Sequence, residues 1–224
     1  MNPLELRGVT KHRDDFTLGP LDLVVPRGYV MGLIGANGAG KTTTIKTALG
    51  LVRPDAGSVR LIDRARVGVV HDAPAYVPDW TAAQIGRALA PFYPAWDADR
   101  YAGLLAWAGI EASKKVKELS RGMGMKLQLA VALGHGAELL ILDEPTSGLD
   151  PLARSELIEL VADFMTDPEH AVLFSTHITT DLDKIADYVT IIDDGRIVAS
   201  TTRDDLVDGY RMVRGPVSGV DASL

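Results

Sequence analysis

The sequence predicts an α/β fold: a mostly parallel sheet with helices, an antiparallel β edge and an inserted helical lobe. Three observations support this prediction. Short apolar runs of strand length alternate with segments of helical periodicity, which is typical of parallel sheets. A glycine-rich segment joins one of these runs to a helix-forming stretch. Between about residues 73 and 133, prolines, all three tryptophans and helical spacing interrupt the alternation, which indicates a mainly helical insertion.

Before the insertion, turns separate the apolar runs. The expected strands cover residues 4–9, 21–25, 29–34, 57–62 and 67–70. A helix is expected over residues 42–51, because Gly50 and Pro54 mark its end.

Within the insertion, two sets of residues follow the i, i+3, i+4, i+7 spacing of an amphipathic helix. They are Tyr101, Leu104, Leu105 and Ala108, and then Leu127, Ala130, Val131 and Gly134.

After the insertion, strands are expected at 139–142, 171–174, 189–193 and 196–200, and Asp194-Gly195 predicts a two-residue hairpin turn. A helix between the first two strands carries Leu157, Leu160, Val161 and Phe164. Residues 1–214 are therefore expected to form one domain, and the polar residues 215–224 a loose tail.

Composition narrows the possible partners. The formal net charge of −7 argues against bulk nucleic-acid binding, which a basic face normally supports. The chain has no cysteine, so it forms no disulfide and no thiolate metal site. No apolar run approaches the roughly 20 residues that span a bilayer, and no signal peptide is apparent. Any membrane association is therefore expected to depend on a partner.

Residues 35–42 fit the pattern G-x-x-x-x-G-K-[ST]. Glycines let successive backbone N–H groups wrap phosphates, and the following helix directs its positive end at them. Lys41 is expected to reach the β- and γ-phosphates, and the Thr42 hydroxyl to coordinate Mg²⁺. The alternative is an ordinary glycine-rich turn, but the position after a strand and before a helix favours phosphate binding. The expected phosphate contacts are Asn37, Gly38, Ala39, Gly40, Lys41, Thr42 and Thr43.

Three further motifs restrict the kind of phosphate-binding protein. An apolar run ends in Asp143-Glu144, followed by Pro-Thr-Ser-Gly-Leu-Asp. Leu-Ser-Arg-Gly-Met stands at 119–123, and Ser-Thr-His at 175–177. In order and spacing these motifs resemble the ABC (ATP-binding cassette) ATPases across nearly the whole chain. The sequence is most similar to exporter-type cassettes of small bacterial operons, including the antibiotic- and bacitracin-resistance group.

The resemblance implies a role for each motif. Asp143 binds Mg²⁺ directly or through water, Glu144 polarises the attacking water, and His177 contacts the γ-phosphate. Ser120 and Gly122 contact the γ-phosphate bound by the opposite subunit of a dimer. Asp150 matches an aspartate at the dimer interface, and it also fits the N-cap of a helix that begins with proline; both roles are compatible.

The sequence departs from the family pattern in three places. Arg121 and Met123 replace a glycine and a glutamine, and Arg121 either reaches phosphate or lies in solvent. Asp72 aligns with the usual position of a glutamine after the strand at 67–70. The resemblance implies that its carboxylate could still serve Mg²⁺ or its water. Arg13 aligns with the aromatic residue that stacks on adenine in many relatives; either its guanidinium stacks instead, or Phe16 substitutes, or the base is held loosely.

The resemblance therefore implies Mg²⁺-dependent hydrolysis of ATP by a cassette that pairs with a second cassette, as a homodimer or a heterodimer. The pair would energise export through a separately encoded transmembrane subunit, from the cytoplasmic face of the membrane. Two alternatives remain: an ABC-type ATPase that acts on ribosomes or DNA, and a non-catalytic nucleotide sensor. The intact Lys41, Asp143 and Glu144 speak against the sensor. The transported substrate is not encoded in this chain.

Overall fold

The structure is a computed structural model that describes residues 1–13, 15–72 and 75–209. Its main sheet has six strands in the order β5-β6-β7-β3-β8-β9. All neighbouring pairs are parallel except β8 and β9. The strands are β3 (Val30–Ile34), β5 (Val67–Val70), β6 (Leu139–Asp143), β7 (Ala171–Thr176), β8 (Tyr188–Asp193) and β9 (Arg196–Thr202).

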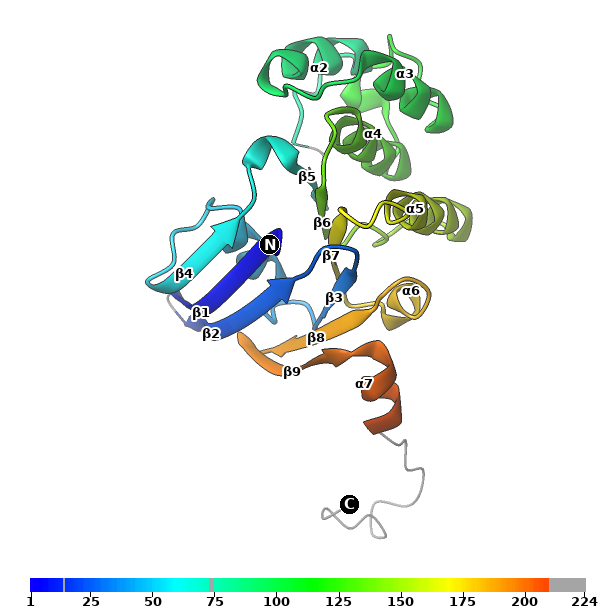
Figure 1. Cartoon of the computed structure of the whole chain (residues 1–224). Coiled ribbons are helices and arrows are strands. Elements are labelled where there is room, and N and C mark those ends of the chain that lie inside the picture. The colour runs from blue at the N-terminus through cyan, green and yellow to red at the C-terminus, as the bar shows by residue number, and fades with distance from the viewer. Residues whose placement is uncertain (14, 73–74, 210–224) are drawn as a thin grey trace.

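A second, antiparallel sheet has the order β2-β1-β4 (Figure 1). Its strands are β1 (Leu4–Arg13), β2 (Phe16–Val25) and β4 (Ala56–Leu61). Together the two sheets confirm the predicted fold class. The first two strands extend well beyond the apolar runs at 4–9 and 21–25, because cross-strand pairing continues to Arg13 and Phe16.

The helices are α1 (Lys41–Ala48), α2 (Ala82–Leu89), α3 (Ala98–Trp107), α4 (Arg121–Gly134), α5 (Pro151–Phe164), α6 (Thr179–Leu182) and α7 (Arg203–Gly209). Three short 3₁₀ turns lie at Arg64–Arg66, Ala90–Phe92 and Val116–Glu118. Figure 1 shows α2, α3 and α4 gathered beyond the β5 end of the main sheet. The expected start of the insertion at 73–74 and the tail at 215–224 lie outside the described residues.

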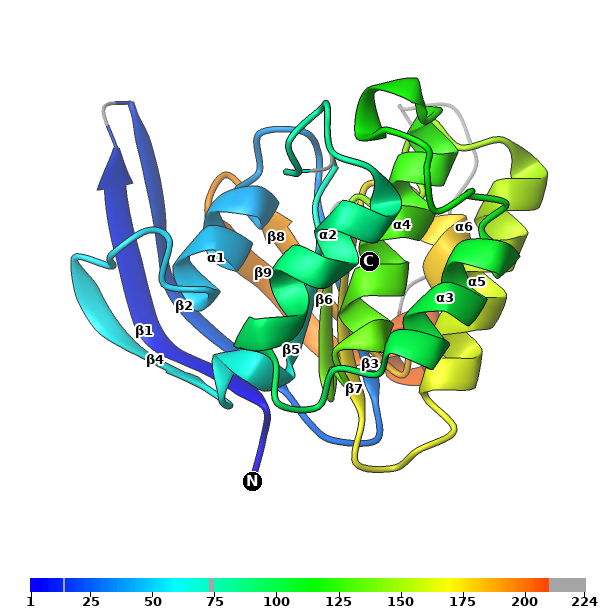
Figure 2. The ribbon, with the colours of Figure 1, turned by 90° about the horizontal axis from the view of Figure 1, so that it is seen from above.

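The main sheet separates two hydrophobic cores, because its central strands are buried on both faces. Alternate residues of β6 face opposite sides: Leu139 and Ile141 pack with the antiparallel sheet and α1, whereas Leu140 and Leu142 pack with α4 and α5. Figure 2 shows the same division, with α1 and the antiparallel sheet on one side and α4 and α5 on the other.

Helix α4 belongs to two cores at once. Met125, Leu129 and Leu133 pack on the main sheet, while Leu127 and Val131 pack against α2 and α3. The periodicity at 127–134 predicted only the second of these faces. The helix therefore joins the helical lobe to the sheet.

Two local predictions can be compared directly with the backbone. Asp194 and Gly195 have φ values of 40° and 74°, as a two-residue hairpin turn between β8 and β9 requires, so the predicted turn is confirmed. The helix expected at 42–51 is shorter and starts one residue earlier, at Lys41; Gly50, with φ 71°, follows its end. Among the described residues, no helix combines the length and apolarity needed to cross a bilayer.

Candidate functional site

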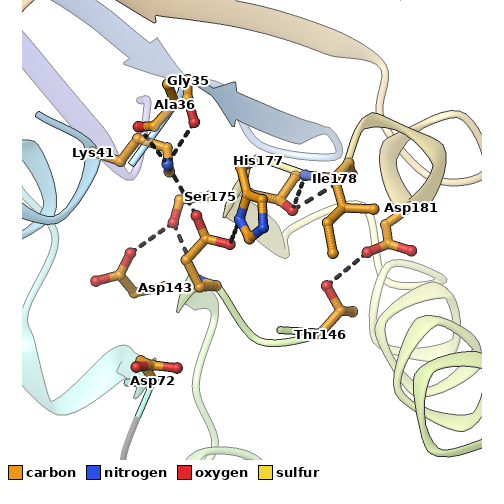
Figure 3. Close-up of polar contacts among 12 residues, drawn as sticks. Gly35, Ala36, Lys41, Asp72, Asp143, Thr146, Ser175, His177, Ile178 and Asp181 are labelled. Carbon is orange, nitrogen blue, oxygen red and sulfur yellow. Dashed lines mark hydrogen bonds and ion pairs between the residues drawn. The ribbon is translucent and has the colours of Figure 1, made fainter. Parts of the chain in front are cut away.

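The predicted motifs meet at one edge of the main sheet. Strands β6, β7 and β3 are neighbours and parallel, so their carboxyl ends lie side by side, with Ile34 paired to Thr176 and Asp143 to Ser175. The loop at 35–40 follows β3, His177 follows β7, and β6 ends at Asp143, with Glu144 next in the chain. Figure 3 shows Lys41, Asp143 and His177 gathered at this edge. In open α/β sheets this edge is where ligands bind.

A pocket of about 410 Å³ opens at this edge. It is lined by Arg13, Phe16, Ala36, Asn37, Gly38, Gly40, Lys41, Thr42, Thr43, Asp72, Asp143 and Glu144. Most of the residues that the sequence assigned to phosphate, base and metal therefore surround one cavity. Helix α1 begins at Lys41, and the first-turn amides of a helix have no acceptor within it, so they are available to an anion.

Glycine is required at position 40 for two reasons. Its φ of 112° lies in the left-handed region, and a β-carbon there would lie 2.8 Å from Leu18 Cδ1. Ala39 differs from the other loop residues: it is buried, it does not line the pocket, and its amide donates to Ala36 O at 3.1 Å. Its predicted phosphate contact therefore has no free amide in this conformation.

Lys41 lies almost fully buried beneath the loop. Its Nζ donates to Gly35 O at 2.6 Å and to Ala36 O at 3.2 Å, and lies 3.0 Å from Glu144 Oε1. These contacts hold the ammonium group between the loop carbonyls, as Figure 3 shows for Gly35 and Ala36, and the Glu144 carboxylate that follows β6.

Glu144 is held between a lysine and a histidine. Its second oxygen, Oε2, lies 2.8 Å from His177 Nδ1. Its backbone has φ 51°, a left-handed conformation that costs a non-glycine residue energy. Its amide donates to Ser175 O and Ser175 Oγ, at 3.1 and 3.2 Å, and these bonds hold the turn.

Ser175 is the site residue that the sequence reasoning missed. Its hydroxyl is fully buried and donates to Asp143 Oδ1 at 2.7 Å. It thus fixes both acidic residues, one through the side chain and the other through the backbone. The signal was its place in the Ser-Thr-His motif, where only the histidine was given a role.

A second buried bond ties the loop after Glu144 to the segment after His177. Thr146 Oγ1 donates to Asp181 Oδ2 at 2.6 Å, and both residues are buried. Neither was singled out as a site residue in the sequence.

Ser120 and Gly122 stand apart from the pocket, since neither lines it. Ser120 is exposed and caps α4, with its Oγ accepting from Met123 N at 3.2 Å. Asp150 caps α5 in the same way, accepting from Leu152 N and Ala153 N at 3.0 Å, and Pro151 begins the helix. The N-cap expected of Asp150 is therefore confirmed.

Comparison with known proteins shows the family to which this chain belongs. The profile described as "ABC transporter" matches residues 18–147. The chain belongs to the ABC transporter family. It is 38% identical over 221 residues to the "Nod factor export ATP-binding protein I" of Cupriavidus pinatubonensis, covering 92% of this chain and 68% of that protein. The protein of the same name from Ralstonia nicotianae is 33% identical, with 91% and 68% covered.

Solved structures agree. One described as "Structure of ATP binding subunit of ABC transporter" has a TM-score of 0.84 and 29% identity, and covers 92% of both chains. A nucleotide-free ATP-binding cassette from an ABC transporter, at 19% identity, shares the fold with a TM-score of 0.77 and covers 93% of this chain and 94% of its own. These comparisons confirm the resemblance stated from the motifs: the chain is an ATP-binding subunit of the ABC transporter type, with ATPase activity.

Proposed function

We propose that the pocket beneath residues 35–42 holds MgATP, and that this cassette hydrolyses it to energise export through a separate membrane-spanning chain. The observation that carries the proposal is the contact series Lys41–Glu144–His177 at the carboxyl ends of β3, β6 and β7. The series places Lys41, a cation that can bind phosphate, beside Glu144, a carboxylate that can accept a proton from water. His177 orients that carboxylate.

Binding follows from the contacts of Lys41. Its ammonium group lies against two carbonyl oxygens and one carboxylate. Phosphate oxygens can replace the two carbonyl oxygens as partners of the ammonium group, because a charge-assisted hydrogen bond to an anionic oxygen is stronger than a bond to a neutral carbonyl. A γ-phosphate that draws Lys41 toward itself would release Glu144 Oε1, which then becomes free to accept a proton from water.

Hydrolysis needs a base that is in place before the reaction. Glu144 is only 14% exposed, and His177 Nδ1 holds its other oxygen at 2.8 Å. The other oxygen, Oε1, is buried against Lys41 Nζ, and we assign it the role of the base once bound phosphate has drawn the lysine away. His177 is more exposed than Glu144, so we assign it both the orientation of the base and the contact to the γ-phosphate.

The donors near the loop fit Mg²⁺. Among the described residues, no cluster of three or more histidine, cysteine or acidic side chains forms a closed metal cage. Mg²⁺ is usually held by one or two protein groups together with substrate phosphates and water. Thr42 and Asp143 line the pocket and supply one hydroxyl and one carboxylate. When bound, the metal would neutralise charge on the β- and γ-phosphates.

The position of Ser120 and Gly122 favours a composite site. They lie at the amino end of α4, outside the pocket of their own chain, where they are accessible to a second cassette. We assign them, with Asp150, to the surface that meets the ATP bound by that cassette. Both a homodimer and a heterodimer fit this assignment.

The partner and the direction of transport rest on relatives. Several are named as export ATP-binding proteins, and a Clostridium perfringens structure is described as part of the transporter complex cbiONQ. We infer a separately encoded transmembrane subunit, a position at the cytoplasmic face of the membrane, and export. These names favour transport over action on ribosomes or DNA.

Titration of a fluorescent ATP analogue with Mg²⁺ tests the proposal. Lys41→Ala should abolish binding, because it removes the cation directed at the β- and γ-phosphates. Lys46→Ala is the matched control: it changes an exposed lysine on the same helix, and binding should stay within twofold of wild type. Unchanged binding by Lys41→Ala would contradict the assignment of residues 35–42 to phosphate.

A further inference from the structure

Two of the departures from the family pattern contact each other. Arg121 Nη2 forms an ion pair and hydrogen bond with Asp72 Oδ1, across 49 residues of sequence. The guanidinium was expected to reach phosphate or solvent, and the carboxylate was expected to serve Mg²⁺. In this structure each is instead the partner of the other.

The Arg121 side chain also lies over the loop that follows the acidic pair. A β-carbon on Gly148 would stand 3.2 Å from Arg121 Nε and 3.3 Å from its Cζ, so the side chain packs against this glycine. Gly148 has φ 70°, which favours glycine for a second reason. One arginine therefore touches two separate loops.

A buried side-chain amide holds Asp72 close to Arg121. Gln128, on α4, accepts from His71 N and donates to His71 O, both at 2.9 Å, and is only 2% exposed. This bidentate bond clamps the residue before Asp72 to α4. Asp72 is thereby held near the start of that helix, where Arg121 is the first residue.

Helix electrostatics explain why Arg121 needs an anion. The amino end of a helix carries partial positive charge, so a cation at its first position is unfavourable unless an anion is near. The Asp72 carboxylate supplies that anion. Both side chains are about half exposed, 47% for Arg121 and 60% for Asp72, so the interaction is of modest strength.

We propose that Asp72 is a positioning residue that holds Arg121 across Gly148 within the same chain. The pair links three segments: the residues after β5, the start of α4 with Ser120 and Gly122, and the loop after Glu144. Asp72 lines the pocket, but its Oδ1 is bound by Arg121, so we assign Asp72 a role through Arg121 and not as a metal ligand. This inference rests on the proposed function for its kinetic test, but its structural test needs no nucleotide.

The structural test is amide hydrogen exchange on purified full-length protein without nucleotide. Asp72→Asn and Arg121→Gln should each speed exchange of the amides at 123–125, at the start of α4, by about three- to fivefold, the range of an exposed ion pair. The double variant should show the same factor, because either single change already breaks the pair. The matched control is Asp79→Asn, which breaks an exposed ion pair with Lys117 and should leave these amides unchanged.

The kinetic test uses ATP turnover of the same variants. Each single variant should lose about three- to fivefold, and the double variant no more. Asp72→Gln should likewise keep at least a tenth of wild-type turnover. The Mg²⁺ concentration that half-saturates binding of a fluorescent ATP analogue should change less than twofold in Asp72→Asn, because the carboxylate is not a ligand.

Several results would overturn the inference. If Asp72 and Arg121 had independent roles, the losses of ATP turnover in the two single variants would multiply in the double variant. A tenfold rise in the half-saturating Mg²⁺ concentration for Asp72→Asn would make Asp72 a metal ligand. A hundredfold loss for Arg121→Gln with none for Asp72→Asn would make Arg121 a phosphate contact. If wild type binds and hydrolyses no ATP, the proposed function fails, while hydrogen exchange still decides whether the pair positions α4.

Discussion

The change Glu144→Gln tests the assigned hydrolysis chemistry most directly. The amide keeps the size of the carboxylate but removes its charge and its basicity. The ion pair with Lys41 Nζ at 3.0 Å depends on that charge, whereas an amide oxygen can still accept the hydrogen bond from His177 Nδ1 at 2.8 Å. Loss of a general base typically costs 10²–10⁴-fold in rate. We therefore expect kcat to fall at least ~100-fold, a rise in the barrier of about 2.7 kcal/mol.

ATP binding should persist in this variant. Lys41 loses an intramolecular ion pair and is then freer to bind phosphate, and Asp143 is unchanged. If hydrolysis opens a dimer of cassettes, Glu144→Gln with MgATP should accumulate that dimer. Sedimentation with and without MgATP measures the mass, and phosphate release measures turnover.

Ser120 provides the matched control for the dimer. Its hydroxyl caps α4 by accepting from Met123 N. A substitution such as Ser120→Arg would remove this cap and alter the interface at the same time, so the two effects could not be separated. Asparagine and aspartate both retain capping. In the Glu144→Gln background, Ser120→Asp should abolish ATP-driven dimerisation by repelling the opposite γ-phosphate, whereas Ser120→Asn should preserve most of it.

Three outcomes would count against this reasoning. Turnover within tenfold of wild type would remove Glu144 as the base. Monomeric mass with ATP bound would show that this chain forms no dimer with itself; mixing with a candidate second cassette then separates a heterodimer from a wrong composite-site assignment. Full dimerisation by the Ser120→Asp double variant would exclude residues 119–123 as the contact to the opposite phosphate.

Three further predictions follow from buried groups. Ser175→Ala should lower turnover about tenfold, because a hydrogen bond to a charged group such as Asp143 contributes about 1.5–3 kcal/mol; Ser200→Ala on the edge strand β9 is the control. Burial lowers the pKa of His135, so the folded protein should lose stability as the pH falls below ~6.5, where the unfolded chain binds the proton more readily. Urea titrations should show a weaker pH dependence of stability for His135→Phe, and an equal pH dependence would contradict this assignment to His135. Leu129→Ala should cost about 2–5 kcal/mol of unfolding free energy, since Leu129 is fully buried, and a cost below 1 kcal/mol would mean the site collapses around the gap.

Much of the fold could be read from the sequence, because it is encoded locally. Apolar runs located the strands of the main sheet, and Val67–Val70 matches its predicted range. The Asp194-Gly195 turn was predictable because only a few residue types adopt positive φ easily. The phosphate loop and the Asp143-Glu144 pair were recognisable because their spacing along the chain is itself the signal.

Contacts between distant segments were not readable in this way. The placement of β3 between β7 and β8 is decided by packing of the whole sheet, and it is what brings Lys41 to Glu144. The sequence showed one apolar face of α4, whereas burial on both faces depends on what lies opposite each.

The clearest contrast is at Asp72 and Arg121. Each could be identified from the sequence as a departure from a motif, and each was assigned its own ligand. Only the tertiary structure shows that they pair, because the contact depends on α4 being clamped to the end of β5 through Gln128. Site residues that form a motif of consecutive positions could therefore be identified from this sequence. A contact between residues 49 apart could not, because it depends on the packing of the whole fold and leaves no local sequence pattern.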